Sequence, residues 1–174
     1  DLYKISPQAG QEVVFTVLAA RLEDKIHDLQ NHLDPILTLR DASGRTLATN
    51  DDYYRADPLL VYKFARAGDY FVEVRDVRYQ GDPNWIYRLT VTQRPYVTAV
   101  MPLAVTRGSA AEVQPVGVNL GETKAIKVTM AGSVAEETSL IQLTTPAGTT
   151  NPVPLIASDL PESVAPGDNT APAK

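Results

Sequence analysis

The stretch YFVEVR, residues 70–75, alternates apolar and polar side chains with a period of two. That period is typical of a β-strand with one buried face. YRLTVT at residues 87–92 and the stretch at 60–64 repeat the pattern, ILTL at 36–39 adds a shorter run, and VVFTVL at 13–18 is apolar on both sides. We therefore expect a strand at each of these places, with residues 13–18 in the centre of a sheet that is covered on both faces.

Turn signals separate these strands. Glycine or proline occurs in each of the segments 8–11, 41–44, 66–69 and 80–83. Glycine supplies the positive φ that many turns need, and proline fixes φ near −65°. Short strands joined by such turns predict an all-β fold, either a β-sandwich or a jelly roll.

The composition of the chain changes near residue 94. Eleven of the twelve aromatic residues lie at or before Tyr87, whereas nine of the thirteen prolines follow residue 94. This shift predicts a first sandwich module over residues 1–94 and a smaller immunoglobulin-like β module over residues 95–160. We expect the strands of the second module near residues 97–105, 112–120, 125–130 and 139–144. Residues 161–174 are rich in Pro, Ala, Ser, Asp and Gly and predict a linker.

One segment of the first module breaks the β pattern. Leu22, Ile26, Leu29 and Leu33 are spaced four, three and four residues apart, with charged residues between them. That spacing is helical, so we expect a short helix within residues 22–33 whose apolar stripe packs on an edge of the sandwich.

Charge and composition exclude several classes of function. The 174 residues carry 16 Lys and Arg against 21 Asp and Glu, a net charge of −5, so we do not expect a nucleic-acid partner. No apolar run approaches the roughly 20 residues of a membrane helix, so we expect no membrane span in this chain. Cysteine is absent, which excludes disulfides and thiolate metal sites, and the two histidines leave little room for histidine chemistry.

The densest group of oxygen-bearing side chains predicts a candidate metal site. It consists of Asp34, Asn50, Asp51, Asp52 and Asp57. Calcium takes six to eight oxygens at about 2.3–2.6 Å, and loops between sandwich strands can supply them. The alternative is that these side chains bond to the backbone of their own turns. Both interpretations stay open, with Ca²⁺ as the expected cofactor under the first.

Four aromatic residues form a candidate ligand-binding group in predicted loops or at strand edges. They are Tyr53, Tyr54, Tyr79 and Trp85. Exposed rings beside acidic and amide groups are typical of sugar-binding surfaces. The alternative for Trp85 is that it caps the hydrophobic core.

No constellation predicts catalysis. Adjacent strand residues point to opposite faces, so Asp51 and Asp52 are poorly arranged as an acid and base pair. Ser6, Ser43 and Ser109 occupy turn contexts, and no Gly-x-Ser-x-Gly elbow occurs. We therefore expect no enzymatic activity. We also expect the charged residues of the run RDVR, 75–78, to face solvent and to pair across strands.

Several dispersed blocks occur together in an order that resembles the bacterial pre-peptidase C-terminal domain, most of all the versions found in secreted or surface proteins of planctomycete-type bacteria. The blocks are residues 1–3, 9–11, 33–44, 47–52, 67–74 and 87–91. The resemblance implies a β-sandwich or jelly-roll module that is exported, is not catalytic, and is attached to a secreted peptidase or another extracellular protein.

The second module carries a shorter resemblance. Residues 95–102, 107–108 and 117–120 are similar to the start of an immunoglobulin-like module of the transcription-factor-immunoglobulin type (IPT/TIG). In secreted bacterial proteins such a module is implied to be a spacer or an interaction domain.

These expectations combine into one functional hypothesis and one alternative. The first is a non-catalytic, extracellular or cell-surface accessory module, a spacer or an adhesion or protein-interaction element of a larger bacterial protein, whose partners are other modules of the same polypeptide or surface proteins. The alternative is a carbohydrate-binding module of a secreted degradative enzyme, with polysaccharide as its partner.

Overall fold

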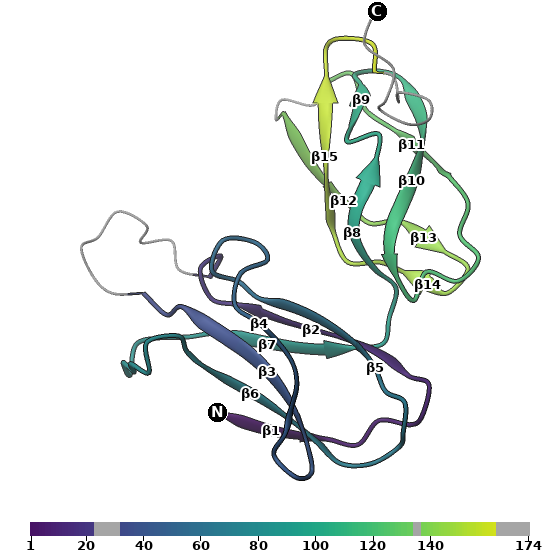
Figure 1. Ribbon diagram of the computed structural model, residues 1–174. Coiled ribbons are helices and arrows are strands. Elements are labelled where there is room, and N and C mark those ends of the chain that lie inside the picture. The colour runs from purple at the N-terminus through teal and green to yellow at the C-terminus, as the bar shows by residue number, and fades with distance from the viewer. Residues whose placement is uncertain (23–31, 134–136, 163–174) are drawn as a thin grey trace, which may run out of the picture. The chain divides into compact units, whose positions relative to one another are not determined.

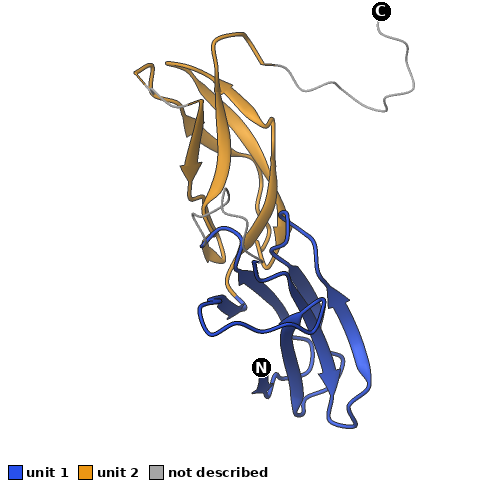
Figure 2. Ribbon diagram, turned by 90° about the vertical axis from the view of Figure 1, so that its left-hand side faces the viewer, with its two compact units in different colours: residues 1–93 blue, residues 94–174 orange. Residues whose placement is uncertain are grey.

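The computed structural model describes residues 1–22, 32–133 and 137–162. Within these ranges every regular element is a β-strand, so the predicted all-β fold class is confirmed. None of the described elements is a helix long and apolar enough to cross a membrane. The chain divides into two compact units, residues 1–93 and residues 94–174 (Figure 2).

Unit 1 consists of two antiparallel sheets that pack face to face (Figure 1). The four-stranded sheet has the order β1-β6-β3-β4, with β1 Leu2–Ile5, β6 Tyr70–Asp76, β3 Pro35–Asp41 and β4 Thr46–Asn50. The three-stranded sheet has the order β5-β2-β7, with β5 Leu59–Lys63, β2 Glu12–Leu18 and β7 Arg88–Thr92. Two sheets whose inner faces alternate with polar outer faces are the arrangement of a β-sandwich.

The core of unit 1 lies between the two sheets. Phe15 at the centre of β2 is fully buried and lies opposite Leu60 of β5 and Val91 of β7. On the other sheet, inward-facing leucines of β3 lie opposite inward-facing valines of β6. Phe64 is also fully buried, and its ring meets those of Tyr62 and Tyr70 edge-on, with centroids 5.0 and 4.6 Å away. Because one face of each strand packs into this core, the alternation of apolar side chains with a period of two was enough to predict the sandwich.

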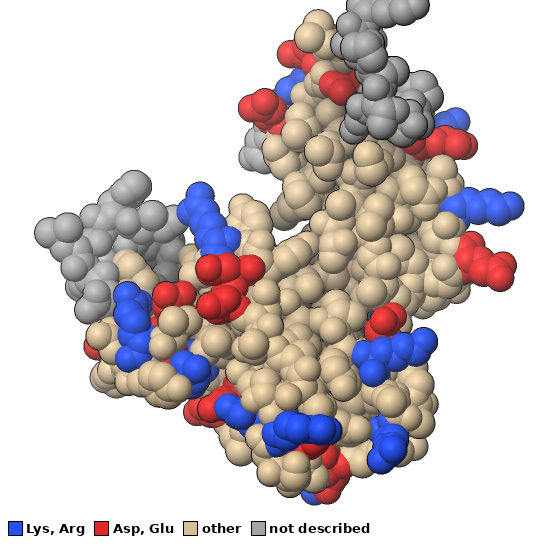
Figure 3. Space-filling view, viewed as in Figure 1, with Lys and Arg blue, Asp and Glu red and all other residues tan. Residues whose placement is uncertain are grey.

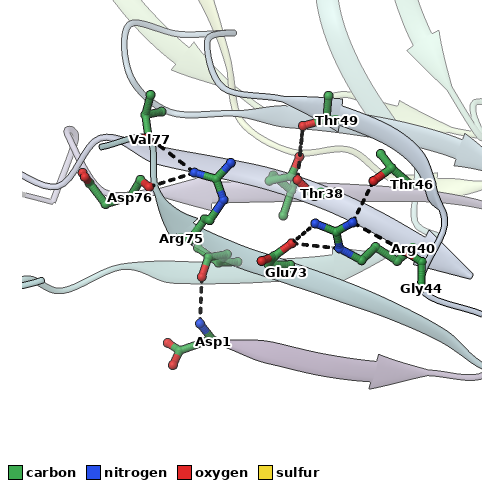
Figure 4. Close-up of polar contacts among 12 residues, drawn as sticks. Asp1, Thr38, Arg40, Gly44, Thr46, Thr49, Glu73, Arg75, Asp76 and Val77 are labelled. Atoms are coloured by element: carbon green, nitrogen blue, oxygen red, sulfur yellow. Dashed lines mark hydrogen bonds and ion pairs between the residues drawn. The ribbon is translucent and has the colours of Figure 1, made fainter. Parts of the chain in front are cut away.

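The outer face of the four-stranded sheet is held by polar pairs that cross between strands (Figure 4). Arg40 of β3 donates from Nε and Nη2 to Oε2 of Glu73 on β6, at 2.9 and 2.6 Å, and from Nη1 to Thr46 on β4. Thr38 and Thr49 form a hydroxyl pair at 3.2 Å. Acidic and basic side chains are accordingly interspersed on the visible surface of unit 1 (Figure 3).

Five strands of unit 1 occur where the alternation predicted them, namely β2, β3, β5, β6 and β7. The prediction missed β1 and β4. The burial of β1 is low along its whole length, and TLATN in β4 has one large apolar residue. Both strands are paired along the backbone with a neighbour in the four-stranded sheet. This pairing makes them strands although their own hydrophobic pattern is weak.

Unit 2 has two three-stranded sheets and a short hairpin. The first sheet has the order β11-β10-β8, with β11 Ile126–Thr129, β10 Ala110–Val118 and β8 Tyr96–Met101. The second has the order β12-β15-β9, with β12 Thr138–Ile141, β15 Val153–Ser158 and β9 Ala104–Thr106, and its β15 and β9 are parallel. The hairpin joins β13 Thr144–Thr145 to β14 Gly148–Thr149.

Two expectations for unit 2 were wrong. Residues 97–105 do not form one strand, because the chain passes from the first sheet to the second between β8 and β9, at Pro102. Proline has no N–H with which to continue a sheet ladder. The expected strand at 139–144 stops at Ile141, and β15 was not predicted at all, since Pro154 lies within it. The side chain positions of β15 nevertheless alternate, with Val153, Leu155 and Ala157 buried.

Two other expectations fall mainly on residues that the structure does not describe. The predicted helix at 22–33 covers residues 23–31, and the predicted linker covers residues 163–174; both ranges lie outside the described residues. Of the residues that flank the first range, Leu33 is buried in the core of unit 1 and Leu22 is 39% exposed.

Candidate functional site

The candidate residues from the sequence lie at one end of the unit 1 sandwich (Figure 1). Strands β4 and β6 end there, while β3 and β5 begin there, as shown by the pairs Leu37 with Asn50 and Pro35 with Asp76. The side chain of Asn50 accepts a hydrogen bond from the backbone N–H of Leu59 at 3.0 Å, which joins the end of β4 to the start of β5. Segments 32–34, 51–58 and 77–87 are therefore neighbours at this end.

Asp57 holds together the segment that follows β2. Its side chain is fully buried, and Oδ1 accepts hydrogen bonds from the backbone N–H groups of Ala19 and Ala20 at 2.7 and 2.9 Å. Oδ2 accepts from Nε of Arg21 at 2.5 Å. A buried carboxylate that is fully provided with donors stabilises its loop, whereas one without donors would be costly. Asp57 therefore has a structural role that accounts for its burial.

These bonds bear on the calcium interpretation. Among the described residues, no three or more His, Asp or Glu side chains are grouped closely enough to hold a metal ion. Asp57 and Asn50 use their side-chain oxygens on backbone N–H groups of residues 38 and 9 positions away, rather than on the backbone of their own turns. Asp51 and Asp52 are exposed, and Asp34 is half-buried. Calcium binding stays a prediction, and these residues would have to supply it without the carboxylate of Asp57.

Asp76 organises the turn after β6, which corrects the expectation that it faces solvent. Its side chain is buried and accepts hydrogen bonds from the backbone N–H groups of Arg78, Gln80 and Asp34 at 2.9, 3.1 and 3.1 Å. Burial favours the protonated carboxyl, but these three donors and the charge of Arg78 outweigh it and hold the pKa of Asp76 below its usual range. An aspartate that bonds to the N–H two residues later is a common turn signal, so this role of Asp76 has a local signal in the sequence.

Arg75 faces the same turn. Its Nη1 donates to the carbonyl oxygens of Asp76 and Val77 at 3.0 and 3.4 Å (Figure 4). Its guanidinium lies 4.1 Å from the ring centroid of Tyr79, within the range of a cation–π contact. Tyr79 has φ of +58° and its side chain is 79% exposed. The turn therefore presents one tyrosine ring to solvent on a rigid, hydrogen-bonded base.

A depression of about 460 Å³ lies beside this turn, and we call it the Tyr79 depression. It contains two of the four aromatic residues that the sequence singled out, Tyr79 and Trp85, and a third ring from Tyr87. Its exposed polar lining includes Gln80 and Asp82, while Asp76, which also borders it, has a buried side chain. Acidic and amide groups beside several rings are the combination that sugar recognition uses.

Trp85 serves both of the roles that the sequence left open. It is half-buried and packs against the core of unit 1, as a core cap does. It also lines the Tyr79 depression. Burial therefore does not separate the two interpretations of this residue.

Tyr53 and Tyr54 are not part of the depression. They are 48% and 52% exposed, and they lie on the segment that Asp57 anchors. The guanidinium of Arg21 lies 4.8 Å from the ring centroid of Tyr54. Partial burial raises the pKa of Tyr53, although the charge of Arg21 opposes this. The four predicted aromatic residues thus belong to two separate segments, of which only the second borders a depression.

A chain of hydroxyl groups that the sequence did not suggest connects the two sheets. The phenolic oxygens of Tyr3 on β1 and Tyr87, next to β7, are 2.5 Å apart, and the Tyr87 hydroxyl donates to the carboxylate of Asp1. Partial burial is the main cause that raises the pKa of Tyr87 well above its usual value, and the neighbouring Tyr3 raises it further. No local signal marks this contact, because its members are more than 80 positions apart in the chain.

The serines considered as nucleophiles are all engaged in hydrogen bonds. Ser6 donates to Asp69 at 2.7 Å, Ser43 donates to Asp41 at 2.6 Å, and Ser109 donates to the carbonyl of Thr106 at 2.7 Å. A serine nucleophile needs instead a hydrogen bond to a general base. The bonds of Ser43 and Ser109 lie within turns, whereas that of Ser6 joins segments 63 positions apart.

Part of this chain is similar to a known protein. A stretch of 74 residues, 42% of the chain, is 35% identical to a probable subtilase-type serine protease of Deinococcus radiodurans. The matched stretch amounts to 9% of that protein, so the likeness concerns a small part of it. No protein-family model matches the chain, and no solved structure matches it.

Proposed function

We propose that this chain is a non-catalytic accessory module of a larger secreted or cell-surface bacterial protein. The observation that carries the proposal is the partial match to a subtilase-type protease, which involves 9% of that protein's length. A short stretch of a large protease is the expected size of an appended module rather than of its catalytic domain. In this proposal unit 1 is a domain of the pre-peptidase C-terminal type, and unit 2 is an immunoglobulin-like spacer or interaction domain.

The packing of unit 1 supports an accessory role. The space between its sheets is filled by side chains, among them the fully buried Phe15 and Phe64. Asp57 and Asp76, which are buried, accept hydrogen bonds from the backbone of neighbouring loops. Acidic groups engaged in this way hold loops in place and are not available for proton transfer to a substrate.

Direct assays test the non-catalytic part of the proposal. We expect the purified chain to leave casein and fluorogenic peptides intact and to remain unlabelled by a fluorophosphonate probe, with subtilisin as the positive control. Turnover that copurifies with the chain and is lost in the D51N or D52N variant would overturn it.

Antibody labelling tests the proposed location. Antibodies raised against the purified chain should label intact cells of the source bacterium or detect the parent protein in the culture medium. A signal that appears only after lysis would contradict an extracellular role.

The Tyr79 depression favours carbohydrate binding as a second candidate function. Its rings and polar groups support stacking against a sugar and hydrogen bonding to it. If it binds sugar, then Y79A should weaken retention in affinity gels that contain chitin, cellulose or xylan. Y53F and Y53A are matched controls, because Tyr53 is an exposed tyrosine of the same unit outside the depression. Equal migration of Y79A and wild type in every gel that retards the wild type would reject this site.

A further inference from the structure

Three aspartates of unit 1 are followed directly by proline, at residues 34–35, 57–58 and 82–83. A peptide bond between aspartate and proline is hydrolysed in acid more readily than other peptide bonds. The proline nitrogen carries no hydrogen and an extra carbon substituent, so it is protonated more easily and leaves more easily. The aspartate carboxylate can also attack its own main-chain carbonyl carbon. The three bonds share this chemistry, and the fold decides which of them can react.

The bond between Asp57 and Pro58 is shielded. Both residues are buried. Oδ1 of Asp57 accepts from two backbone N–H groups and Oδ2 accepts from Arg21. Neither carboxylate oxygen is available for attack, and solvent does not reach the proline nitrogen to protonate it.

The bond between Asp34 and Pro35 is held by the four-stranded sheet. Pro35 is buried as the first residue of β3 and lies opposite Asp76 of β6. The carbonyl oxygen of Asp34 accepts from the backbone N–H of Val77 at 2.8 Å. The leaving nitrogen is therefore sheltered from acid, and the paired strands would hold the two ends of a broken bond together.

The bond between Asp82 and Pro83 lies in an exposed turn between β6 and β7. All four residues from Gly81 to Asn84 are exposed. The carbonyl oxygen of Asp82 accepts from the backbone N–H of Trp85 at 3.1 Å, and Oδ1 of Asp82 accepts from that of Asn84 at 2.8 Å. Proline thus occupies the second position of a hydrogen-bonded turn, where its fixed φ fits. Among the described residues no donor engages Oδ2 of Asp82.

The two hydrogen bonds of this turn favour an attack by the carboxylate. The bond from Asn84 restricts the rotation of the Asp82 side chain beside its own carbonyl group, which lowers the entropic cost of attack. The bond from Trp85 donates to the oxygen on which negative charge develops when the carbonyl carbon is attacked. Solvent can deliver a proton to the exposed Pro83 nitrogen. The turn therefore combines a nucleophile, an oxyanion donor and access to acid at one bond.

We propose that the bond between Asp82 and Pro83 is a self-cleavage site of this chain in acid. Oδ2 of Asp82 attacks the main-chain carbonyl carbon of the same residue. The bond from that carbon to the Pro83 nitrogen breaks, and the nitrogen keeps the electron pair and takes a proton from solvent. The cyclic anhydride left at Asp82 is opened by one water molecule into two carboxyl groups. The step needs no oxidant, reductant or second substrate.

Self-cleavage would separate residues 1–82 from residues 83–174, the second of which carry β7 and unit 2. The backbone pairing of β7 with residues 14–18 of β2 does not involve the broken bond, so we expect unit 1 to stay assembled until it is unfolded. The reaction consumes one bond of the chain and turns over no substrate. It is therefore independent of the accessory role proposed above.

Intact-mass spectrometry of the purified full chain tests the proposal, after incubation in neutral buffer and at about pH 4, where carboxyl groups are partly ionised. Circular dichroism selects the lowest pH at which the chain stays folded. We expect fragments 1–82 and 83–174 to form at that pH, with a rate at least about tenfold above that at the other two Asp–Pro bonds. The rate constant should not depend on protein concentration, because the reaction is intramolecular. In the same buffer with enough urea to unfold the chain, all three bonds should be cleaved.

Variants and isotope labelling identify the nucleophile. D82N keeps an acceptor for the Asn84 N–H but replaces the carboxylate, and it should be cleaved at least about tenfold more slowly. D51N is the matched control, since Asp51 is an exposed aspartate that no proline follows, and it should be cleaved like the wild type. In water enriched in heavy oxygen, opening of an anhydride labels either carboxyl group of Asp82, whereas direct hydrolysis labels only the main-chain one. We expect label in the side chain of a share of the 1–82 fragments.

Four outcomes would overturn the proposal. The first is no cleavage at residue 82 of the folded chain under conditions that cleave the urea-unfolded chain. The second is similar cleavage at all three Asp–Pro bonds of the folded chain. The third is cleavage of D82N at the wild-type rate, and the fourth is label confined to the main-chain carboxyl group. None of these outcomes bears on whether the chain hydrolyses other proteins or where it is located.

Discussion

At the scale of single residues, buried aspartates anchor the loops at the candidate end of unit 1. Asp57 accepts three hydrogen bonds from residues 19–21, and Asp76 accepts three from the backbone of residues 34, 78 and 80. Each aspartate also lies near an arginine, Arg21 or Arg78. Asp57, a candidate metal ligand, and Asp76, which was expected to face solvent, therefore both have a structural role that their residue type alone did not reveal.

We expect D57A to lower the free energy of unfolding of unit 1 by about 3 kcal/mol, because it leaves two backbone N–H groups and a guanidinium without their acceptor. Urea titration followed by fluorescence of Trp85, the single tryptophan, measures this free energy of unfolding. D57N keeps an acceptor oxygen and should lose less. D51A, at an exposed position, is the control and should change stability by less than about 0.5 kcal/mol.

The outcomes of this series are distinct. A loss in D57A no larger than that in D51A would show that the hydrogen bonds of Asp57 contribute little. Repeating the wild-type measurement with a chelator and with millimolar calcium tests the predicted metal, since a ligand that binds only the folded state raises its melting temperature. Equal melting temperatures in the two solutions would remove calcium from the description of this protein.

At the scale of elements, unit 2 depends on a close backbone approach between two strands. The register of β10 against β8 shifts between Val116 and Gly117. A Cβ atom at Gly117 would lie 2.0 Å from the carbonyl oxygen of Tyr96 and 2.9 Å from Cα of Val97. Both are backbone atoms of β8, so no side-chain rotation relieves the clash. Glycine is required here for proximity, at a β-bulge.

We therefore expect G117A to destabilise unit 2 by about 3 kcal/mol or more, because β8 must move away from β10 to accommodate the methyl group. Differential scanning calorimetry, with hydrogen exchange to assign the transition to unit 2, measures the change. G132A is the matched control, since the nearest atom to a Cβ there is Cα of Gly108 at 3.6 Å, an ordinary contact. Equal stability of the two variants would mean that the strands do not approach this closely.

At the scale of the whole molecule, the two units have separate hydrophobic cores. The core of unit 1 is formed by residues before 90, and that of unit 2 by residues from Val97 to Ala157. No buried residue belongs to both clusters among the described parts of the chain. Each unit therefore has a core of its own with which to maintain its fold.

We expect the units to unfold independently. L155A removes a fully buried side chain from the core of unit 2 and should lower the stability of that unit by about 2–5 kcal/mol. The urea transition reported by Trp85 should stay within about 0.5 kcal/mol of wild type, because Trp85 belongs to unit 1. L39A, in the core of unit 1, should shift that transition. A shift of the Trp85 signal in L155A would show that the units are coupled.

The sequence by itself determined the all-β class and the places of β2, β3, β5, β6 and β7, because alternation records which side of a strand meets the core. It could not locate β1, β4 or β15, whose pattern is weak or contains proline and whose pairing partners are distant in the chain. It also named candidate residues at 34, 50–57 and 79–85, and the structure places these segments at one end of unit 1.

Only the tertiary structure decided what these residues do. It placed Tyr79 and Trp85 beside one depression and Tyr53 and Tyr54 outside it. It also brought distant backbone N–H groups within hydrogen-bonding distance of Asp57 and Asp76. The physical reason is that side-chain periodicity is a property of one strand, whereas burial, hydrogen bonding and unpaired edges depend on which strands become neighbours.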